Sequence, residues 1–235
     1  MGLKDDLQSE VKGIFAISDK WKTRKGQVVP EAEDIKLGND AVTFDEAVVL
    51  YADLADSTEL VNGYKDWFAA EVYKTYLHCA SKIIRAHGGV ITAFDGDRVM
   101  AVYLGDHKRT NAAKTALKIN YAVRDIINPA IANQFSTTPY RVSQRVGIDV
   151  SKLFVARTGI RGSNDLVWVG RAANYAAKLC GISEGGYSSF ITAEVHDKLN
   201  EDAKLGGDPK RAMWEQFYWE ERGVYAYRSN WWWGL

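Results

Sequence analysis

Few cysteines, no net charge and no long apolar run limit what this 235-residue chain can be. Its two cysteines, Cys79 and Cys180, lack the spacing of a metal site or of a disulfide framework, which favours a reducing compartment. Lysine plus arginine and aspartate plus glutamate number 30 each, so the charge balance gives no indication of nucleic acid or an anionic membrane as partner. No apolar run is long enough to span a bilayer, and the N-terminus lacks the apolar core of a signal peptide. We therefore expect a soluble, cytoplasmic protein that binds a small charged ligand.

The chain length suits one sizeable domain with a small appendage, and the sequence contains no internal repeat and no low-complexity tract. Apolar residues at helical spacing within 3–14 predict an amphipathic helix, which must pack on something. Residues 20–40 mix charge, glycine and proline without periodicity, which is typical of an arm. We therefore expect a helix and arm over 1–40 and the main domain over 41–235.

A buried strand is predicted directly before an acid. The run Val48–Ala52 is short, β-branched and aromatic, as expected of a strand buried on both faces. Asp53 follows it, and Tyr51 shares a face with Asp53 because side chains alternate along a strand. An acid at that edge is costly unless a cation meets it.

A second acid comes from a predicted hairpin over residues 88–103. Asp95-Gly96 separates two apolar, β-rich runs, which places Asp97 at the first residue of the returning strand. If the hairpin lies beside the first strand, Asp53 and Asp97 can hold divalent metal such as magnesium between them, since hard cations prefer oxygen ligands and leave room for phosphates. An Asp-Gly pair alone is usually just a turn, and the nearby Asp53 favours a site.

A phosphate seat is predicted after the first strand. Asp56 or Ser57 can cap a helix there, and a helix N-terminus with Ser57 and Thr58 in the turn suits a phosphate group. The segment 64–87 is strongly helical and ends at two glycines. For Asp56, the helix cap is the simplest role.

A polar stripe is predicted on a later helix that opens after Gly170. Arg171, Asn174 and Lys178 fall at helical spacing and so line one face of an alanine-rich segment. Two cations at such spacing are a solvated face in most proteins, and the asparagine between them is what argues for a site. The other predicted elements are a helix over 109–127 ended or kinked by Asn128-Pro129, a strand over 142–150 with a short continuation over 153–158, a strand over 166–169, a segment over 190–192, a helix over 193–199 and a last aromatic β segment.

The order of these motifs resembles the catalytic domain of class III nucleotidyl cyclases, from about Ala41 to the C-terminus. It is carried by D-L-A-D-S-T, the G-G…G-D hairpin, V-G-I-D-V and V-G-x-x-x-N-x-A-A-K-L. Including the arm with V-V-P and L-G-N-D-A-V, the sequence is most similar to the pyrimidine cyclases of bacterial Pycsar anti-phage defence. The resemblance implies an α+β, ferredoxin-like fold: a central, mostly antiparallel sheet with flanking helices. It also implies a head-to-tail homodimer whose sites combine the metal acids of one protomer with the Asn174 helix of the other, so that a monomer is inactive.

The resemblance assigns a metal and phosphate site. Asp53 and Asp97 match two metal-binding aspartates, and the Leu54 carbonyl is the expected further ligand. Two divalent ions, Mn²⁺ or Mg²⁺, are implied for each site. The turn from Ala55 to Thr58 matches the loop that cradles the triphosphate.

The resemblance also assigns the polar helix. Asn174 matches the asparagine that orients the ribose. Lys178 stands where the family has an arginine that stabilises charge on the α-phosphate, a departure because lysine lacks the bidentate fork, and Arg171 on the same face can share that task. Arg222 weakly matches a basic residue that contacts the terminal phosphates. Asp149 replaces a residue usual in the family's G-I-H-x-G strand.

The predicted base pocket departs from that of purine cyclases. Ala93 and Val167 stand where the purine enzymes have a lysine and its acidic or polar partner, so the groups that read a purine edge are missing. Tyr51 and Trp168 can stack on or crowd the base and so favour a pyrimidine, although both residue types are more often packing groups. No residue of the sequence separates a uracil edge from a cytosine edge, and the Pycsar resemblance alone favours UTP.

These inferences predict an enzyme that converts UTP to 3′,5′-cyclic UMP and pyrophosphate, by two-metal-assisted attack of the ribose 3′-hydroxyl on the α-phosphate, as a second messenger in antiviral defence. A cytidylate cyclase or a purine cyclase with other base contacts is the first alternative. A non-catalytic nucleotide-binding regulator is the second. A palm-type polymerase shares the paired acids, but the charge balance shows no basic surface for a nucleic acid.

Overall fold

The computed structural model describes residues 2–17 and 20–235, in two compact units. The smaller unit comprises Met1–Glu46 and Lys152–Gly170, and the larger unit comprises Ala47–Ser151 and Arg171–Leu235. Within the described ranges, no helix has both the length and the apolarity needed to cross a membrane.

Apart from α1, α3 and α4, the described helices are short. They are α1 (Leu3–Phe15), α2 (Ser57–Gly63), α3 (Asp66–Ala86), α4 (Lys108–Tyr121), α5 (Asn128–Gln134), α6 (Arg171–Cys180), α7 (Ala193–His196) and α8 (Glu201–Lys204). A π-helical segment, Ala122–Ile127, joins α4 to α5, and single 3₁₀ turns form at Ala32–Asp34, Glu184–Gly186 and Glu220–Arg222.

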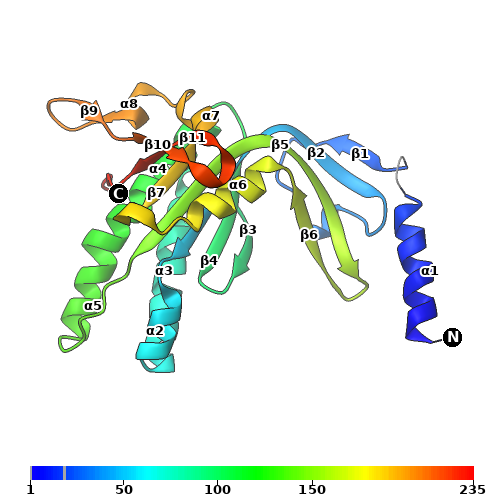
Figure 1. The fold of residues 1–235 in the computed structure, drawn as a ribbon, viewed down its shortest axis with the longest axis horizontal. Helices are drawn as coiled ribbons and strands as arrows, with labels where there is room; N and C mark the ends of the chain where they lie inside the picture. Colours follow the sequence, from blue (N-terminus) through cyan, green and yellow to red (C-terminus); the bar gives the residue numbers. More distant parts are fainter. Residues whose placement is uncertain (1, 18–19) are drawn as a thin grey trace. The chain divides into compact units, whose positions relative to one another are not determined.

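The strands are β1 (Lys22–Lys25), β2 (Asp40–Leu54), β3 (Val90–Asp95), β4 (Arg98–Tyr103), β5 (Gln144–Ile160), β6 (Ser163–Val169), β7 (Ser189–Thr192), β8 (Leu205–Gly206), β9 (Arg211–Ala212), β10 (Glu215–Trp219) and β11 (Val224–Ser229). Seven of these strands follow the order β10-β11-β7-β5-β2-β4-β3 in the main sheet (Figure 1). The β10/β11, β11/β7, β2/β4 and β3/β4 pairs are antiparallel and the β5/β7 pair is parallel. The predicted mostly antiparallel sheet with flanking helices is confirmed.

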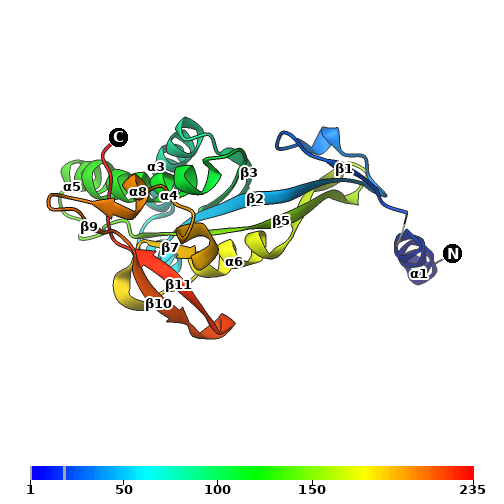
Figure 2. The same cartoon turned by 90° about the horizontal axis from the view of Figure 1, so that it is seen from above.

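The two faces of this sheet are covered differently. Alternate residues of β2, among them Val48, Leu50 and Ala52, join the main core with apolar residues of α3 and α4. Helix α6 packs on the other face, against Gly147, where a Cβ atom would lie 2.1 Å from the Ala176 carbonyl oxygen. Figure 2 shows α3 and α4 on one side of β2 and β5 and α6 on the other. The glycine therefore permits α6 to approach the sheet closely.

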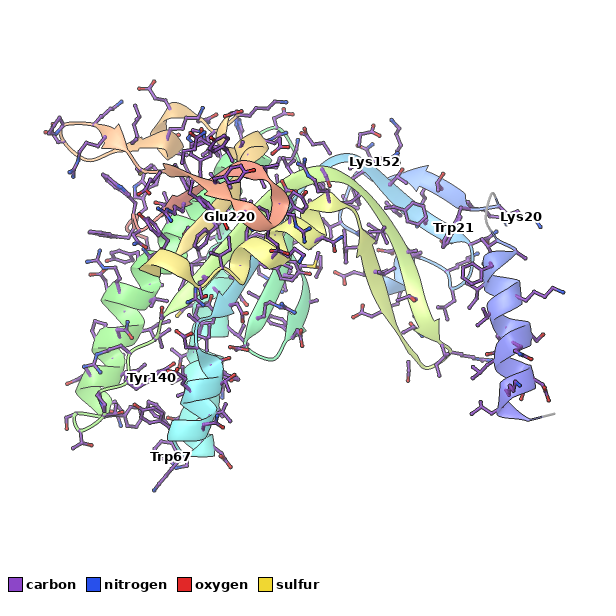
Figure 3. All side chains as sticks on the ribbon, viewed as in Figure 1. Lys20, Trp21, Trp67, Tyr140, Lys152 and Glu220 are labelled. Carbon is purple, nitrogen blue, oxygen red and sulfur yellow. The ribbon has the colours of Figure 1, made fainter. Side chains whose placement is uncertain are left out.

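In the smaller unit, β1 pairs in parallel with the first part of β2, and β6 pairs antiparallel with the last part of β5. Trp21, labelled in Figure 3, packs edge to face on Phe154 with the ring centroids 5.1 Å apart. Helix α1 confirms the predicted N-terminal helix, but none of its residues is buried by the described part of the chain. The expected packing partner of α1 is therefore not found there.

Several predicted boundaries were wrong. Strand β2 begins at Asp40 rather than near Val48, because the backbone of β1, which lies within the 20–40 arm, pairs with its first residues. Strand β5 covers the predicted strand and its predicted continuation without a break, from Gln144 to Ile160. The helix predicted over 109–127 continues into α5 despite Pro129, since the π-helical segment changes the hydrogen-bond spacing before the proline.

Candidate functional site

The end of β2 and the β3–β4 turn bring two predicted acids together. The predicted hairpin is confirmed, and it lies beside β2 with Ala52 opposite Val99. Asp97 lies inside the turn rather than first on β4, because Gly96, with a φ of 61°, takes the first turn position and Asp95 pairs with Arg98. The prediction for Asp97 was thus wrong by one residue, and its position still adjoins the end of β2.

Each acid has a buried oxygen that lacks a hydrogen-bond partner among the described residues, Oδ1 of Asp53 and Oδ2 of Asp97. Burial first, and then the negative charge of Asp97, raise the pKa of Asp53 to about 6. The Arg98 charge and the Leu54 amide act in the opposite direction. Two crowded carboxylates with unpaired oxygens form a donor set that suits a divalent cation.

The acid pair contains only two carboxylates. No cluster of three or more His, Cys, Asp or Glu side chains suited to a metal ion occurs in residues 2–17 and 20–235. The Asp53 carbonyl oxygen accepts a hydrogen bond from the buried Tyr76 hydroxyl at 3.3 Å, which fixes the backbone next to Leu54, the last residue of β2. A cation held here would therefore need ligands from the backbone, the substrate or water besides the two acids.

The turn after β2 places Ala55–Thr58 at the start of α2. Asp56 occupies the N-cap position in the left-handed conformation, with φ 58° and ψ 32°, and its carbonyl oxygen accepts a hydrogen bond from the Glu59 amide at 3.0 Å. The predicted N-cap position is confirmed, but the Asp56 side chain makes no capping hydrogen bond to the described residues. The carboxylate instead lies 3.9 Å from the Arg145 guanidinium, a cation that the sequence analysis did not identify.

The predicted base contacts of the larger unit lie in one row across three strands. Tyr51 on β2 and Ala93 on β3 are both opposite Met100 on β4, so the three side chains share a face. The Arg98 guanidinium carbon lies 5.3 Å from the centre of the Tyr51 ring. Burial raises the pKa of the Tyr51 hydroxyl, so this phenol is neutral at physiological pH.

Val167 and Trp168 lie on β6 in the smaller unit. Along this strand, exposed and half-buried residues alternate, with Val167 38% exposed and Trp168 among the half-buried ones. Because neighbouring residues of a strand point to opposite faces, these two side chains cannot both contact one base from the same side.

Helix α6 presents Arg171, Asn174 and Lys178 on one exposed face, as their spacing predicted, while Ala176 and Leu179 are buried. The Asn174 amide makes no hydrogen bond to any described residue. It is therefore the one member of the stripe without a partner in this part of the structure.

Arg171 is committed to the buried Asp149, which is 0% exposed. Its Nε and Nη2 atoms donate to the two Asp149 oxygens at 3.0 and 3.2 Å, and its Nη1 atom donates to Glu194 at 2.7 Å. Thr192 donates a further hydrogen bond to Asp149 at 2.6 Å. Burial raises the pKa of Asp149, whereas Thr192 and Arg171 oppose that shift by stabilising the ionised form. The guanidinium thus anchors α6 to β5.

Lys178 and Arg222 share a carboxylate that the sequence analysis did not identify. Lys178 Nζ lies 2.5 Å from Glu221 Oε1, and Arg222 Nη2 donates to the same oxygen at 2.9 Å. Arg222 also lies over the rings of Tyr175 and Trp219, at 5.6 and 5.9 Å from their centres. The adjoining Glu220, labelled in Figure 3, belongs to the turn between β10 and β11. The structure therefore brings Lys178 and Arg222 to one anion-binding position.

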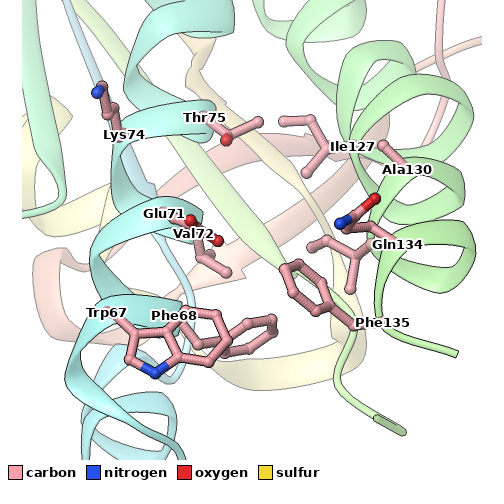
Figure 4. Close-up of a pocket in the computed structure, with 11 residues that line it drawn as sticks. Trp67, Phe68, Glu71, Val72, Lys74, Thr75, Ile127, Ala130, Gln134 and Phe135 are labelled. Atoms are coloured by element: carbon pink, nitrogen blue, oxygen red, sulfur yellow. The ribbon is translucent and has the colours of Figure 1, made fainter. Parts of the chain in front are cut away.

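A cavity of about 430 Å³ adjoins this position and is lined by Lys178, Glu221 and residues of β10. A larger cavity of about 610 Å³ lies between α3 and α5, where Trp67, Phe68 and Phe135 form an apolar end (Figure 4). None of the predicted site residues lines the larger cavity. The predicted polar chemistry is thus at the end of β2 and along α6, and not in this larger cavity between α3 and α5.

The comparison with known proteins gives one consistent result. No family model matches the chain. It is 47% identical to a uridylate cyclase of Xanthomonas perforans over all of both chains, and 50% identical to a uridylate cyclase of Burkholderia cepacia over 99% of each. Among solved structures, it resembles the adenylyl cyclase CyaB of P. aeruginosa, with a TM-score of 0.63 and 22% identity over 80% of this chain and 95% of that one. It also resembles the guanylyl cyclase Cya2, with a TM-score of 0.65 and 17% identity over 78% and 91%. The chain therefore belongs to the uridylate cyclase family, and its fold is that of the class III nucleotidyl cyclases.

Proposed function

We propose that this protein converts UTP to 3′,5′-cyclic UMP and pyrophosphate. The observation that carries the proposal is the acid pair, Asp53 and Asp97, with an unpaired buried oxygen on each, at the end of the strand that also presents Tyr51. The relatives named uridylate cyclase, at 47% and 50% identity, supply the reaction. The missing purine-reading groups at Ala93 and Val167 support a pyrimidine base.

The acid pair fits a divalent metal. Asp53 and Asp97 would supply carboxylate oxygens and Leu54 its carbonyl oxygen, for two ions that we propose to be Mg²⁺ or Mn²⁺. When bound, such ions lower the pKa of the ribose 3′-hydroxyl and neutralise charge on the triphosphate. The raised pKa of Asp53 fits this role, because a nearby cation removes the repulsion that causes part of the shift.

The other residues position the nucleotide for an in-line attack. The turn from Ala55 to Thr58, with Arg145 beside it, binds the triphosphate. Asn174 holds the ribose, so that its 3′-oxygen faces the α-phosphorus. The 3′-hydroxyl releases its proton to solvent, its oxygen forms a bond to the α-phosphorus, the bond from the α-phosphorus to the bridging oxygen breaks, and pyrophosphate leaves with that electron pair. Lys178 stabilises the charge that develops on the α-phosphate, and Arg222 contacts the terminal phosphates.

Arg171 is better placed as a positioning residue than as a phosphate ligand. All three of its guanidinium nitrogens donate to Asp149, Glu194 or the Val150 carbonyl. Moving it onto a phosphate would leave the buried Asp149 without its cation. We assign it the role of holding Asn174 and Lys178 in place.

We propose a head-to-tail homodimer with two shared sites. No hydrogen bond or ion pair between described residues joins the acid pair of a chain to Asn174 or Lys178 of the same chain. The acid pair keeps buried oxygens without a partner among the described residues, and Asn174 is exposed and has no hydrogen-bond partner among them either. A second copy, which turns its α6 stripe toward Asp53 and Asp97, completes each site.

The proposal also covers the base contacts on β6, the division into domains and the cellular location. On β6 we assign the base contact to the exposed Val167 and a packing role to Trp168. Residues 41–235 form the catalytic domain, and 1–40 an accessory helix and arm. We place the enzyme in the cytoplasm, where it makes cyclic UMP as a second messenger in antiviral defence.

The test is incubation of the purified protein with Mn²⁺ and each of ATP, GTP, CTP and UTP, with products identified by mass. Cyclic UMP from UTP, and no product from an Asp53→Ala, Asp97→Ala double variant, is the expected result. Cyclic AMP or cyclic GMP would contradict the argument from Ala93 and Val167. Binding of UTP without any product would favour a non-catalytic regulator.

A further inference from the structure

Arg98 has an unused hydrogen-bond donor next to the predicted base row. Its Nη2 atom donates to Asp95 Oδ2 at 2.7 Å, while its Nε atom is buried and has no partner among the described residues. The guanidinium lies beside the Tyr51 ring. A buried donor left without an acceptor is costly, so an unpaired N–H at a binding site points to a group of the ligand.

The strand register places Arg98 on the ligand side of the sheet. Arg98 is opposite Asp95, and Met100 is opposite Ala93 and Tyr51. Residues two apart on a strand share a face, so Arg98 lies on the same face as this base row. The neighbouring Val99 belongs to the main core on the other face.

We propose that Arg98 reads the base and selects uracil over cytosine, by donating a hydrogen bond to the O4 atom of uracil. This inference rests on the proposed function and deepens it. A guanidinium has only donors. Uracil has an acceptor, O4, at the position where cytosine carries an amino group that donates. With CTP, two donors would face each other and both would be left unpaired.

Asp95 acts through Arg98. Its side chain is 78% exposed and holds the Nη2 atom, which orients the planar guanidinium against Tyr51. Asp95 is thus a positioning residue in this account. The ion pair with Asp95 holds the Arg98 side chain in place, whereas an arginine without such a partner can turn toward solvent more easily.

An alternative role for Arg98, as a counter-charge to the acid pair, predicts a different effect of its substitution on turnover. Its charge also lowers the pKa of Asp53, so it could act only as a counter-charge to the acids. Loss of a counter-charge would change turnover of UTP and CTP by the same factor. Loss of a base contact changes the ratio between the two nucleotides.

The experiment compares Arg98→Gln with Arg98→Lys in the full-length protein. A glutamine amide can donate to O4 or accept from the cytosine amino group, whereas lysine is again only a donor. We expect the ratio of kcat/KM for UTP to that for CTP to fall by about 10- to 100-fold in Arg98→Gln and to change little in Arg98→Lys. Competition binding of UMP against CMP without metal gives the same comparison without turnover.

An unchanged ratio in Arg98→Gln, or equal losses for both nucleotides, overturns the inference. If Arg98→Gln does not fold, Asp95→Asn decides the question: it leaves Arg98 in place and is expected to reduce the same ratio by a smaller factor. If the wild-type protein forms no cyclic UMP, the proposed function fails, and the UMP and CMP affinities still test the base contact separately.

Discussion

At the end of β2, Asp53 and Asp97 each keep a buried oxygen without a partner in the described structure, whereas on α6 Arg171 and Lys178 are each paired with a carboxylate. Asn174 is the member of the α6 stripe that has no partner among the described residues. The acid region is thus under electrostatic strain that a cation would relieve, and the α6 region is already neutralised and held in shape. The acid region is arranged to bind a cation, and the α6 region is arranged to position the nucleotide.

The largest effect is expected at the acid region. Asp97→Ala should lower kcat by about 10³-fold, because it removes a metal ligand. It should not lower the melting temperature, because the repulsion with Asp53 is removed as well. Asp106→Ala, at an exposed acid beyond the hairpin, is the matched control and should keep full activity. More than a tenth of the wild-type kcat in Asp97→Ala would exclude the acid pair as the metal site.

Arg171→Ala, in contrast to Asp97→Ala, should lower the stability of the fold. The expected loss is about 3 kcal/mol, because the substitution leaves the buried Asp149 without its cation. Urea unfolding measures the loss. Adding Asp149→Asn to this variant should recover part of the lost stability, because a buried amide has no charge that needs a cation. Unchanged stability combined with lost activity would show that Arg171 binds substrate directly.

The pH dependence of stability should show the strain on Asp53. Burial and Asp97 raise its pKa from 3.8 to about 6, so between these values the folded protein binds this proton more tightly than the unfolded chain. Raising the pH from about 4 to about 6 therefore costs stability through this group, and the cost is constant above about 6.

Asp53→Asn lacks this titration, so it isolates the effect. The free energy of unfolding of Asp53→Asn minus that of the wild type, measured with a chelator present, should grow up to about pH 6 and then level off. A difference that does not vary with pH would show that the acid pair is not strained in solution.

The smallest effect is expected at Glu221, whose pair with Lys178 is exposed on both sides, at 51% and 43%. Glu221→Gln should leave the melting temperature almost unchanged, because an exposed ion pair contributes little to stability. It releases Lys178 and Arg222 for phosphate, so KM for UTP should fall a few-fold at low salt, and the gain should vanish as salt screens the charges. A raised KM would show that Glu221 positions these cations productively.

The sequence predicted the acid region well because its signals are local. Strand alternation and the Asp-Gly turn act over a few residues, and they were enough to bring Asp53 and Asp97 to one place. The shift of Asp97 into the turn shows the usual limit, since the turn type depends on which residue takes the positive φ. The same alternation predicts that the adjacent residues Val167 and Trp168 point to opposite faces of their strand. The sequence alone therefore indicates that the two side chains do not share one contact with the base.

The α6 region was predicted less completely because its partners are distant in the sequence. Asp149 and Glu221 pair with the stripe only once β5, α6 and the β10–β11 turn are folded together. The same holds for Arg145 beside Asp56. Arg98 could not be identified from the sequence for another reason: the structure is needed to show that its Nε atom is buried without a partner among the described residues.

Mixing two inactive variants, Asp97→Ala and Asn174→Ala, tests most directly whether the two regions meet across a dimer. Each variant alone should form almost no cyclic UMP from UTP. After subunit exchange, the mixture should recover about a quarter of the wild-type rate, because about half of the dimers contain both variants and each of these keeps one intact site of two. No recovery, with exchange confirmed by a tagged subunit, would contradict the shared site.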